Sequence, residues 1–165
     1  MVSMDPSHHQ DVPVHAGIIT VSTSRSGKED KSGAIIQDLL MGAGITVSQT
    51  NIIPDRVDAI RAGVISALQA CNCVILTGGT GITHDDCTIE AVTPLFDKVL
   101  DGFGELFRMK SYEEVGTRMV LSRATAGLVG TSIVFCIPGS PHAATLATRE
   151  IIIPEVRHIL THAGK

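Results

Sequence analysis

The chain has 165 residues, of which 44% are hydrophobic and 3% aromatic, and its formal net charge is −4 at pH 7. This length suits one domain with a sizeable core, which Ile, Val, Leu and Ala must fill because aromatic residues are scarce. The negative charge argues against a nucleic-acid-binding or acidic-membrane surface, since both require a basic face. Because no apolar run could span a bilayer and no signal-peptide pattern is present, we expect a soluble, cytoplasmic protein.

The first predicted strand follows a polar leader. Residues 1–14 are polar and aperiodic, so we expect a flexible leader there. The apolar run His15–Val21 predicts a strand. It leads into a hydroxyl-rich loop with one arginine, which either contacts a ligand or forms an ordinary turn: Ser22, Thr23, Ser24, Arg25, Ser26 and Gly27.

A helix, a strand and a second helix are predicted next. In the first helix, five apolar residues share one face, and Gly44 follows where a left-handed residue would end the helix: Ile35, Ile36, Leu39, Leu40 and Ala43. Residues 45–53 predict the second strand, and apolar residues at helical spacing between positions 57 and 68 predict the second helix. Asp55 lies between these two elements, where the residue pattern favours a helix-entry role over a catalytic one.

A glycine-rich loop follows the predicted strand Cys73–Thr77. Three glycines within four residues, Gly78, Gly79 and Gly81, leave the peptide N–H groups open to a ligand. Thr88 is predicted to cap a helix that begins at residue 89. A strand, a glycine loop and a capped helix together predict an anion-binding crevice, and the alternative is a glycine-rich turn without a ligand. The loop matches neither a P-loop nor the G-x-G-x-x-G pattern.

Two adjacent carboxylates lie between this loop and the predicted helix. Asp85 and Asp86 would repel a phosphate group unless a divalent cation bridged them. Cys87 follows directly, but the sequence places no histidine beside it to activate a nucleophile. The other three cysteines form no Cys-x-x-Cys pair, so we expect neither a zinc site nor a disulfide framework: Cys71, Cys73 and Cys136.

The second half of the chain continues the alternation of helices and strands. Residues 89–99 predict a short helix that bends near Pro94, and residues 110–121 are predicted to be helical in part. Between them, the segment with Phe103 and Phe107 belongs either to the core or to a subunit contact. Ser132–Ile137 predicts a buried strand.

The last predicted element is a helix with a strong start signal. Ser140 is expected to cap it and Pro141 to occupy its first position. Its apolar stripe is predicted to be interrupted at Pro154. Residues 15–165 therefore predict a single α/β domain, a three-layer α/β/α sandwich with a mostly parallel central sheet.

Several separated motifs, in this order, resemble those of the molybdenum-cofactor biosynthesis proteins MoaB and MogA and of the G domain of gephyrin. The motifs are Thr77-Gly78-Gly79-Thr80-Gly81, Asp86-x-Thr88-x-Glu90-Ala91, Gly102-Phe103-Gly104-Glu105, Ser122-Arg123 and Pro138-Gly139-Ser140-Pro141. The segment of residues 102–109 and the segment Glu113-Glu114-Val115-Gly116-Thr117 are more similar to the MoaB branch than to MogA. The resemblance covers the chain from about His15 to the last helix.

The resemblance implies a molybdopterin adenylyltransferase that uses ATP with Mg²⁺. It implies Asp55 and Asp86 as catalytic acids, with Asp86 holding Mg²⁺ against the ATP phosphates, and so reverses the helix-entry interpretation of Asp55. The molybdopterin- and nucleotide-binding residues that it implies are Ser22, Gly78, Gly79, Thr80, Gly81, Thr88, Ser122, Arg123, Gly139 and Ser140. It further implies a homo-oligomer, a trimer or hexamer, and a downstream molybdate-insertion enzyme as a partner.

The sequence departs from the family pattern at two cationic positions. An arginine often precedes the D-x-T motif and a lysine often ends the last motif, whereas this chain has Asp85 and His142. Arg25 or Arg123 is expected to replace the missing charge. Three other interpretations remain: a non-catalytic molybdopterin carrier, a molybdate-insertion enzyme of the MoeA type, which the single-domain length disfavours, and a structural protein without a ligand.

Overall fold

The computed structural model describes residues 12–24 and 30–165 of the chain. Most of the predicted leader, residues 1–11, and Arg25 in the hydroxyl-rich loop lie outside the described residues. The strands are β1 (His15–Val21), β2 (Thr46–Ile53), β3 (Cys73–Thr77), β4 (Lys98–Val99), β5 (Thr125–Val129) and β6 (Ser132–Ile137). The α-helices are α1 (Lys31–Gly42), α2 (Val57–Ala67), α3 (Thr88–Val92), α4 (Asp101–Val115), α5 (Pro141–Ala147) and α6 (Ile153–Ala163).

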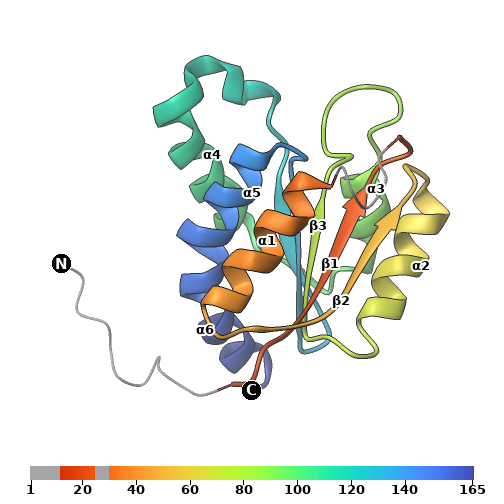
Figure 1. The fold of residues 1–165 in the computed structure, drawn as a ribbon, viewed down its shortest axis with the longest axis vertical. Coiled ribbons are helices and arrows are strands. Elements are labelled where there is room, and N and C mark those ends of the chain that lie inside the picture. The colour runs from red at the N-terminus through yellow and green to blue at the C-terminus, as the bar shows by residue number, and fades with distance from the viewer. Residues whose placement is uncertain (1–11, 25–29) are drawn as a thin grey trace.

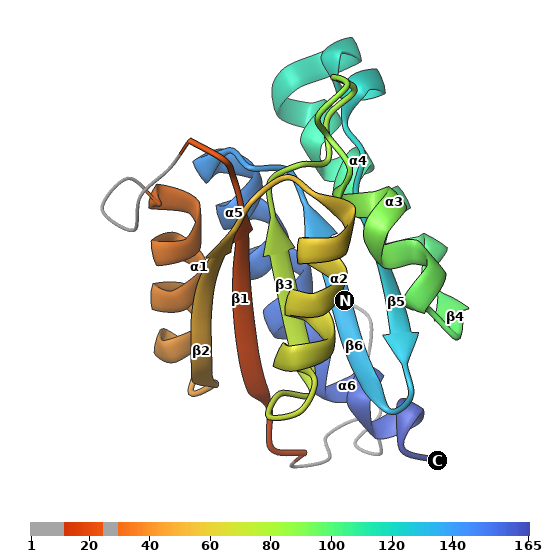
Figure 2. The ribbon, with the colours of Figure 1, turned by 90° about the vertical axis from the view of Figure 1, so that its right-hand side faces the viewer.

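The strands form one six-stranded sheet in the order β2-β1-β3-β6-β5-β4. Figure 2 shows the strands in this order across the sheet. The first four strands of that order are parallel, and β5 and β4 are added antiparallel at one edge. The predicted sandwich with a mostly parallel sheet is confirmed.

Helices cover both faces of the sheet, with α1, α4, α5 and α6 on one side and α2 and α3 on the other (Figure 1). Successive strand residues alternate between the two cores, because side chains of a strand point to opposite faces. Ile18 and Ile75 pack in the first core, whereas Ile19 and Val74 pack in the second. All four are at most 1% exposed, so the apolar strands are buried on both faces as expected for parallel strands.

The carboxyl ends of the central parallel strands lie at the same end of the sheet. Thr77 at the end of β3 pairs with Ile137 at the end of β6, and Thr20 of β1 pairs with Thr77 from the other side. Two segments extend beyond these strand ends in both views: the loop between β3 and α3, and the end of α4 with the 3₁₀ segment Gly116–Leu121 (Figures 1 and 2). The loops that follow these parallel strands therefore come together at the carboxyl end of the sheet.

After the glycine loop, one predicted element is wrong and one observed strand was not predicted. The helix predicted over residues 89–99 ends at Val92, a 3₁₀ turn follows at Thr93–Leu95, and Lys98 and Val99 form β4. The small-residue run that begins at Ala124 forms β5, which the sequence did not predict. Both strands depend on pairing across the sheet edge, where Val99 faces Gly127.

The aromatic pair of α4 is buried in the core. Phe103 and Phe107 are 7% and 1% exposed, and their ring centroids lie 6.4 Å apart. Phe103 also contacts Phe135 of β6, with ring centroids 5.0 Å apart. These contacts fix α4 against the sheet and so determine where its far end extends beyond the sheet edge.

The terminal helix is continuous but locally widened. Ser140 caps α5 by accepting a hydrogen bond from the Ala143 N–H at 3.0 Å, with Pro141 in the first turn, as predicted. Between α5 and α6 the segment Thr148–Ile152 forms a π-helical turn. The interruption predicted at Pro154 thus corresponds to this π-helical turn, just before that residue. Pro154 itself lies in the first turn of α6, where the missing N–H costs little because it would have no partner within the helix.

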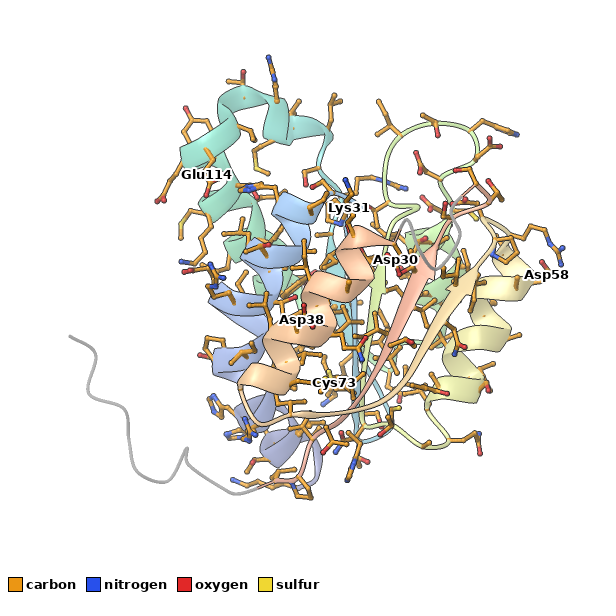
Figure 3. The ribbon with its side chains drawn as sticks, viewed as in Figure 1. Asp30, Lys31, Asp38, Asp58, Cys73 and Glu114 are labelled. Atoms are coloured by element: carbon orange, nitrogen blue, oxygen red, sulfur yellow. The ribbon has the colours of Figure 1, made fainter. Side chains whose placement is uncertain are left out.

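Cys73 and Cys136 are free, buried thiols. Burial raises the pKa of Cys73 and of Cys136 to about 12, so both stay protonated at neutral pH. Cys73 begins β3 at the opposite end of that strand from the glycine loop (Figure 3). Among the described helices, none is both long and apolar enough to cross a membrane.

Candidate functional site

A cavity of about 760 Å³ opens where the central strands end. The residues that line it come from four loops that follow β1, β2, β3 and β6, and from the 3₁₀ segment after α4. They are Val21, Ser22, Thr23, Ser24, Asp55, Gly78, Gly79, Thr80, Gly81, Asp86, Arg118, Leu121, Ser122, Arg123, Pro138, Gly139, Ser140 and Pro141. Segments far apart in the sequence therefore meet in one place.

The glycine loop requires glycine for two separate reasons. Gly78 and Gly79 adopt φ values of +99° and +68°, which side chains disfavour. A Cβ atom at Gly78 would lie 2.5 Å from the carbonyl oxygen of Val21, and one at Gly79 would lie 2.2 Å from Thr88 Oγ1. Gly139 approaches from β6, where a Cβ atom would lie 3.1 Å from the Gly78 Cα. At Gly78, Gly79 and Gly139 the backbone packs so closely against neighbouring atoms that no side chain would fit.

Thr88 forms two hydrogen bonds to the glycine loop and does not cap α3. The cap position belongs to Cys87, and no side chain bonds there. Instead the Thr88 hydroxyl donates to the Gly78 carbonyl at 2.8 Å and the Thr88 N–H donates to the Gly79 carbonyl at 2.9 Å. Thr88 is fully buried and does not line the cavity. The predicted capping role is wrong, and the observed role fixes two successive carbonyls of the loop.

The peptide N–H groups of the loop are available to a ligand. Within residues 12–24 and 30–165, no acceptor receives a hydrogen bond from the N–H groups of Gly79, Thr80 or Gly81. All three residues line the cavity. Unpaired N–H groups on a glycine-rich loop can bind phosphate oxygens.

Asp55 and Asp86 lie on either side of the glycine loop. A Cβ atom at Gly79 would lie 3.1 Å from Asp55 Oδ1, and one at Gly81 would lie 2.6 Å from Asp86 Oδ2. Asp55 Oδ2 accepts a hydrogen bond from the Thr23 N–H at 3.1 Å, and it gives no cap bond to α2. The helix-entry interpretation of Asp55 therefore has no support, because its carboxylate faces the cavity loops.

A tight turn holds the Asp86 carboxylate. Its Oδ2 accepts hydrogen bonds from the N–H and the hydroxyl of Thr83, at 3.0 Å and 2.7 Å. The Asp86 N–H donates to the Thr83 carbonyl in return, at 3.1 Å. No described residue donates to Oδ1 of Asp86 or to Oδ1 of Asp55, so each carboxylate keeps one oxygen for a ligand. Asp85, by contrast, is exposed and does not line the cavity.

Arg123 is held by two partners. Its guanidinium forms a bidentate ion pair with Glu90 of α3. Its Nε also donates to the Thr80 carbonyl at 2.9 Å. The hydrogen bond and charge of Arg123 hold the pKa of Glu90 below its usual value, so the pair stays charged at neutral pH. Arg123 therefore connects the wall before β5 to the glycine loop.

Removing either member of this pair is expected to loosen the glycine loop. Glu90→Gln and Arg123→Gln should each raise amide hydrogen exchange of residues 78–88 by about fivefold, a size typical of a partly exposed pair. The double variant should exchange no faster than Arg123→Gln, because Glu90 acts through that arginine. The exposed pair of Arg56 and Asp58 at the start of α2 is the control, and its removal should leave the loop unchanged. Unchanged exchange in Arg123→Gln would contradict this role.

A divalent cation would find oxygen ligands here but no complete cage. Among the described residues, no group of three or more His, Cys, Asp or Glu side chains is placed to hold a metal ion. Mg²⁺ commonly binds through one or two carboxylates together with water and substrate phosphates. The free oxygens of Asp55 and Asp86 fit that mode, in which a phosphate-bearing ligand completes the coordination.

Cys87 is not suited to act as a nucleophile. Burial raises the pKa of its thiol above the usual value, and the nearby carboxylate of Asp55 raises it further. The thiolate that a nucleophilic mechanism requires is therefore disfavoured at neutral pH.

The sequence-predicted site residues all line this cavity except Thr88. The structure adds two hydroxyl-loop residues, Thr23 and Ser24, two residues of the 3₁₀ segment, Arg118 and Leu121, and the flanking residues Val21, Pro138 and Pro141. The hydroxyl-rich loop was a detectable signal for the first two. No sequence signal marked the 3₁₀ segment, because its place depends on the turn at Gly116, whose φ is +61°. His142 follows the lining residue Pro141 and pairs with Glu114 of α4, with Nε2 2.9 Å from Oε2. Figure 3 labels Glu114 on this helix.

Comparisons with known proteins agree on one family. Residues 17–158 match a family model described as "Probable molybdopterin binding domain". The chain is 43% identical over 163 residues to molybdenum cofactor biosynthesis protein B of Bacillus subtilis, covering 96% of each protein. A crystal structure of a molybdenum cofactor biosynthesis protein B superposes with a TM-score of 0.90 at 41% identity, covering 94% of this chain and 99% of that one. The tungsten cofactor synthesizing protein MoaB of Pyrococcus furiosus superposes with a TM-score of 0.85 at 43% identity, covering 93% and 98%.

Proposed function

Because this chain belongs to the MoaB/MogA family of molybdenum cofactor biosynthesis proteins and carries its molybdopterin-binding domain, we propose that it is a molybdopterin adenylyltransferase. The observation that carries the proposal is the cavity itself. Unpaired N–H groups of the glycine loop and two carboxylates with free oxygens converge on one space. That combination suits a phosphate-bearing substrate with a divalent cation.

The proposed reaction transfers AMP from ATP to the terminal phosphate of molybdopterin. A phosphate oxygen of molybdopterin forms a bond to the α-phosphorus of ATP. The bond between that phosphorus and the bridging oxygen to the β-phosphate breaks, and pyrophosphate leaves with the electron pair. Such transfers depend mostly on positioning and on stabilising charge, and they require no covalent step on the protein.

The proposed roles follow from where the side chains lie. The N–H groups of Gly79, Thr80 and Gly81 would bind phosphate oxygens, which removes the need for a side chain at that wall. Asp86 would bind Mg²⁺ through Oδ1, because the turn with Thr83 holds its other oxygen. When bound, Mg²⁺ would neutralise the developing charge on the phosphates. Asp55 would orient molybdopterin from the other side of the loop.

The remaining proposed ligand contacts lie on the walls that flank the glycine loop. Ser22 follows β1 and Ser122 precedes β5, while Gly139 and Ser140 follow β6. Ser140 already accepts the cap bond of α5, so its place in the wall is fixed. Assembly into a trimer or hexamer and delivery of the product to a molybdate-insertion enzyme remain part of the proposal, to be tested by mass photometry and by pull-down with that enzyme.

The test is turnover by the purified full chain. The protein is incubated with molybdopterin, ATP and Mg²⁺, and adenylylated molybdopterin and pyrophosphate are followed by chromatography with mass detection. We expect both products in equal amounts, and we expect neither when molybdopterin or Mg²⁺ is left out. Binding of molybdopterin without either product would contradict the transferase and would support a carrier in the same pathway.

A further inference from the structure

A phosphate chain in the cavity needs positive charge, and the lining offers little of it. The charged residues among the lining are Asp55, Asp86, Arg118 and Arg123. The charge of Arg123 is offset by Glu90, with which it forms a bidentate pair. Across the described residues, Arg118 is therefore the cation of the lining whose charge no carboxylate offsets. The protein as a whole adds no attraction for an anion, since its formal net charge is −4.

The helical form of the surrounding segment directs Arg118 toward the cavity. A 3₁₀ helix has three residues per turn, so residues i and i+3 lie on the same face. Arg118 and Leu121 have this spacing within Gly116–Leu121, and both line the cavity. Val120, on another face, is 84% exposed and does not line it. The orientation of Arg118 thus follows from the backbone as well as from its reach.

The segment that carries Arg118 is fixed at both ends. Gly116 ends α4 with φ +61°, and its N–H donates to the Tyr112 carbonyl. At the other end the Ser122 N–H donates to the Met119 carbonyl at 2.9 Å, and Arg123 is held by Glu90 and the Thr80 carbonyl. The backbone beside Arg118 is therefore positioned before any ligand binds.

Most described arginines already have an acceptor for the guanidinium. Arg61 and Arg108 donate to the carbonyls of Ala91 and Ala124, and Arg123 donates to Thr80. Arg118, Arg149 and Arg157 have no acceptor among the described residues, and of these three only Arg118 lines the cavity. An unengaged guanidinium can bind a phosphate group with two parallel hydrogen bonds.

We propose that Arg118 binds the phosphate groups of the ligand in this cavity, and that Arg123 acts as a positioning residue for the glycine loop. Arg118, and not Arg123, would then supply the positive charge that the family resemblance leads us to expect at the positions of Asp85 and His142. This inference rests on the proposed function, because it assigns the phosphates of ATP and molybdopterin to this wall of the cavity.

The test measures binding of two probes to the full chain by titration calorimetry in the presence of Mg²⁺. The probes are ATP and inorganic pyrophosphate, which carries no base or sugar. Arg118→Gln should weaken both by about tenfold, the size expected for a bidentate phosphate contact. Arg118→Lys should recover part of the loss, because lysine keeps the charge without the planar fork. Arg149→Gln, an exposed arginine outside the cavity, is the matched control and should bind as the wild type does.

The possible outcomes separate this proposal from the proposed function. If the wild type binds both probes and Arg118→Gln binds them equally well, the role of Arg118 is overturned and adenylyl transfer stands. If pyrophosphate binds in an Arg118-dependent way and ATP does not bind, Arg118 stands and adenylyl transfer fails. If the wild type binds neither probe, both proposals are overturned. An equal loss in Arg118→Gln and Arg118→Lys together with a lowered melting temperature would indicate a structural role and would also overturn the proposal.

Discussion

Asp86→Asn is expected to lower the rate of adenylyl transfer by at least about 100-fold while the fold is retained. The amide oxygen of Asn can take the place of Oδ2 and accept both hydrogen bonds from Thr83, so the turn survives. The amide nitrogen then replaces Oδ1, and the charge that would hold Mg²⁺ is gone. The loss should appear in kcat more than in the affinity for molybdopterin.

Asp85→Asn is the matched control for this variant. It removes one negative charge, as Asp86→Asn does, but at Asp85, which is exposed and does not line the cavity. Initial rates with molybdopterin, ATP and Mg²⁺ should stay within about twofold of the wild type, because screening by water weakens its effect on the site. Equal rates in the wild type and in Asp86→Asn would rule out the proposed role of Asp86.

Gly79→Ala is expected to abolish binding of phosphate ligands and to destabilise the protein by roughly 2 to 4 kcal/mol. The backbone strain at φ +68° contributes about 1 to 2 kcal/mol of that. The new methyl group would also lie 2.2 Å from Thr88 Oγ1 and so displace the buried hydroxyl from the Gly78 carbonyl. The loop would lose the geometry that exposes its N–H groups.

Gly42→Ala provides the comparison for the stability measurement. Gly42 ends α1, its Cβ position is open, and its φ is not positive. Alanine there should be neutral or stabilising by up to about 1 kcal/mol, because it restricts the unfolded chain and favours the helix. Urea unfolding of both variants gives the two values. A Gly79→Ala protein as stable as the wild type would contradict the proposed constraint on the loop.

Much of the fold could be predicted from local sequence signals. Unbroken apolar runs indicated β1, β3 and β6 within the bounds that the structure gives, because strands buried on both faces need no polar residues. The two antiparallel strands, β4 and β5, carried no such signal. Gly127 of β5 fits its place because the Phe96 ring lies over it, where a Cβ atom would come within 2.3 Å. Phe96 is distant from Gly127 in the sequence, so this contact cannot be inferred from the residues around Gly127.

The candidate site was predictable where its residues are adjacent in sequence. The glycines and Asp86 form one continuous motif, and they line one cavity. Asp55 was different, because local pattern favoured helix entry, and only the family resemblance indicated a place in the site. The partner of Arg123 is Glu90, 33 residues away, so no local pattern showed that this arginine is already engaged. Arg118 lines the cavity because it lies on the same face of a 3₁₀ segment as Leu121. The mixed sequence of residues 110–121 did not reveal this segment.

The most direct test of the central claim is a crystal structure of the protein with Mg²⁺, molybdopterin and a non-hydrolysable ATP analogue. We predict that the phosphates lie in the cavity at the ends of β1, β3 and β6, within hydrogen-bonding distance of the N–H groups of residues 79–81, with the metal ion bound to Asp86. Ligands bound elsewhere on the protein, or phosphates that contact neither the glycine loop nor Asp86 through the metal, would contradict it.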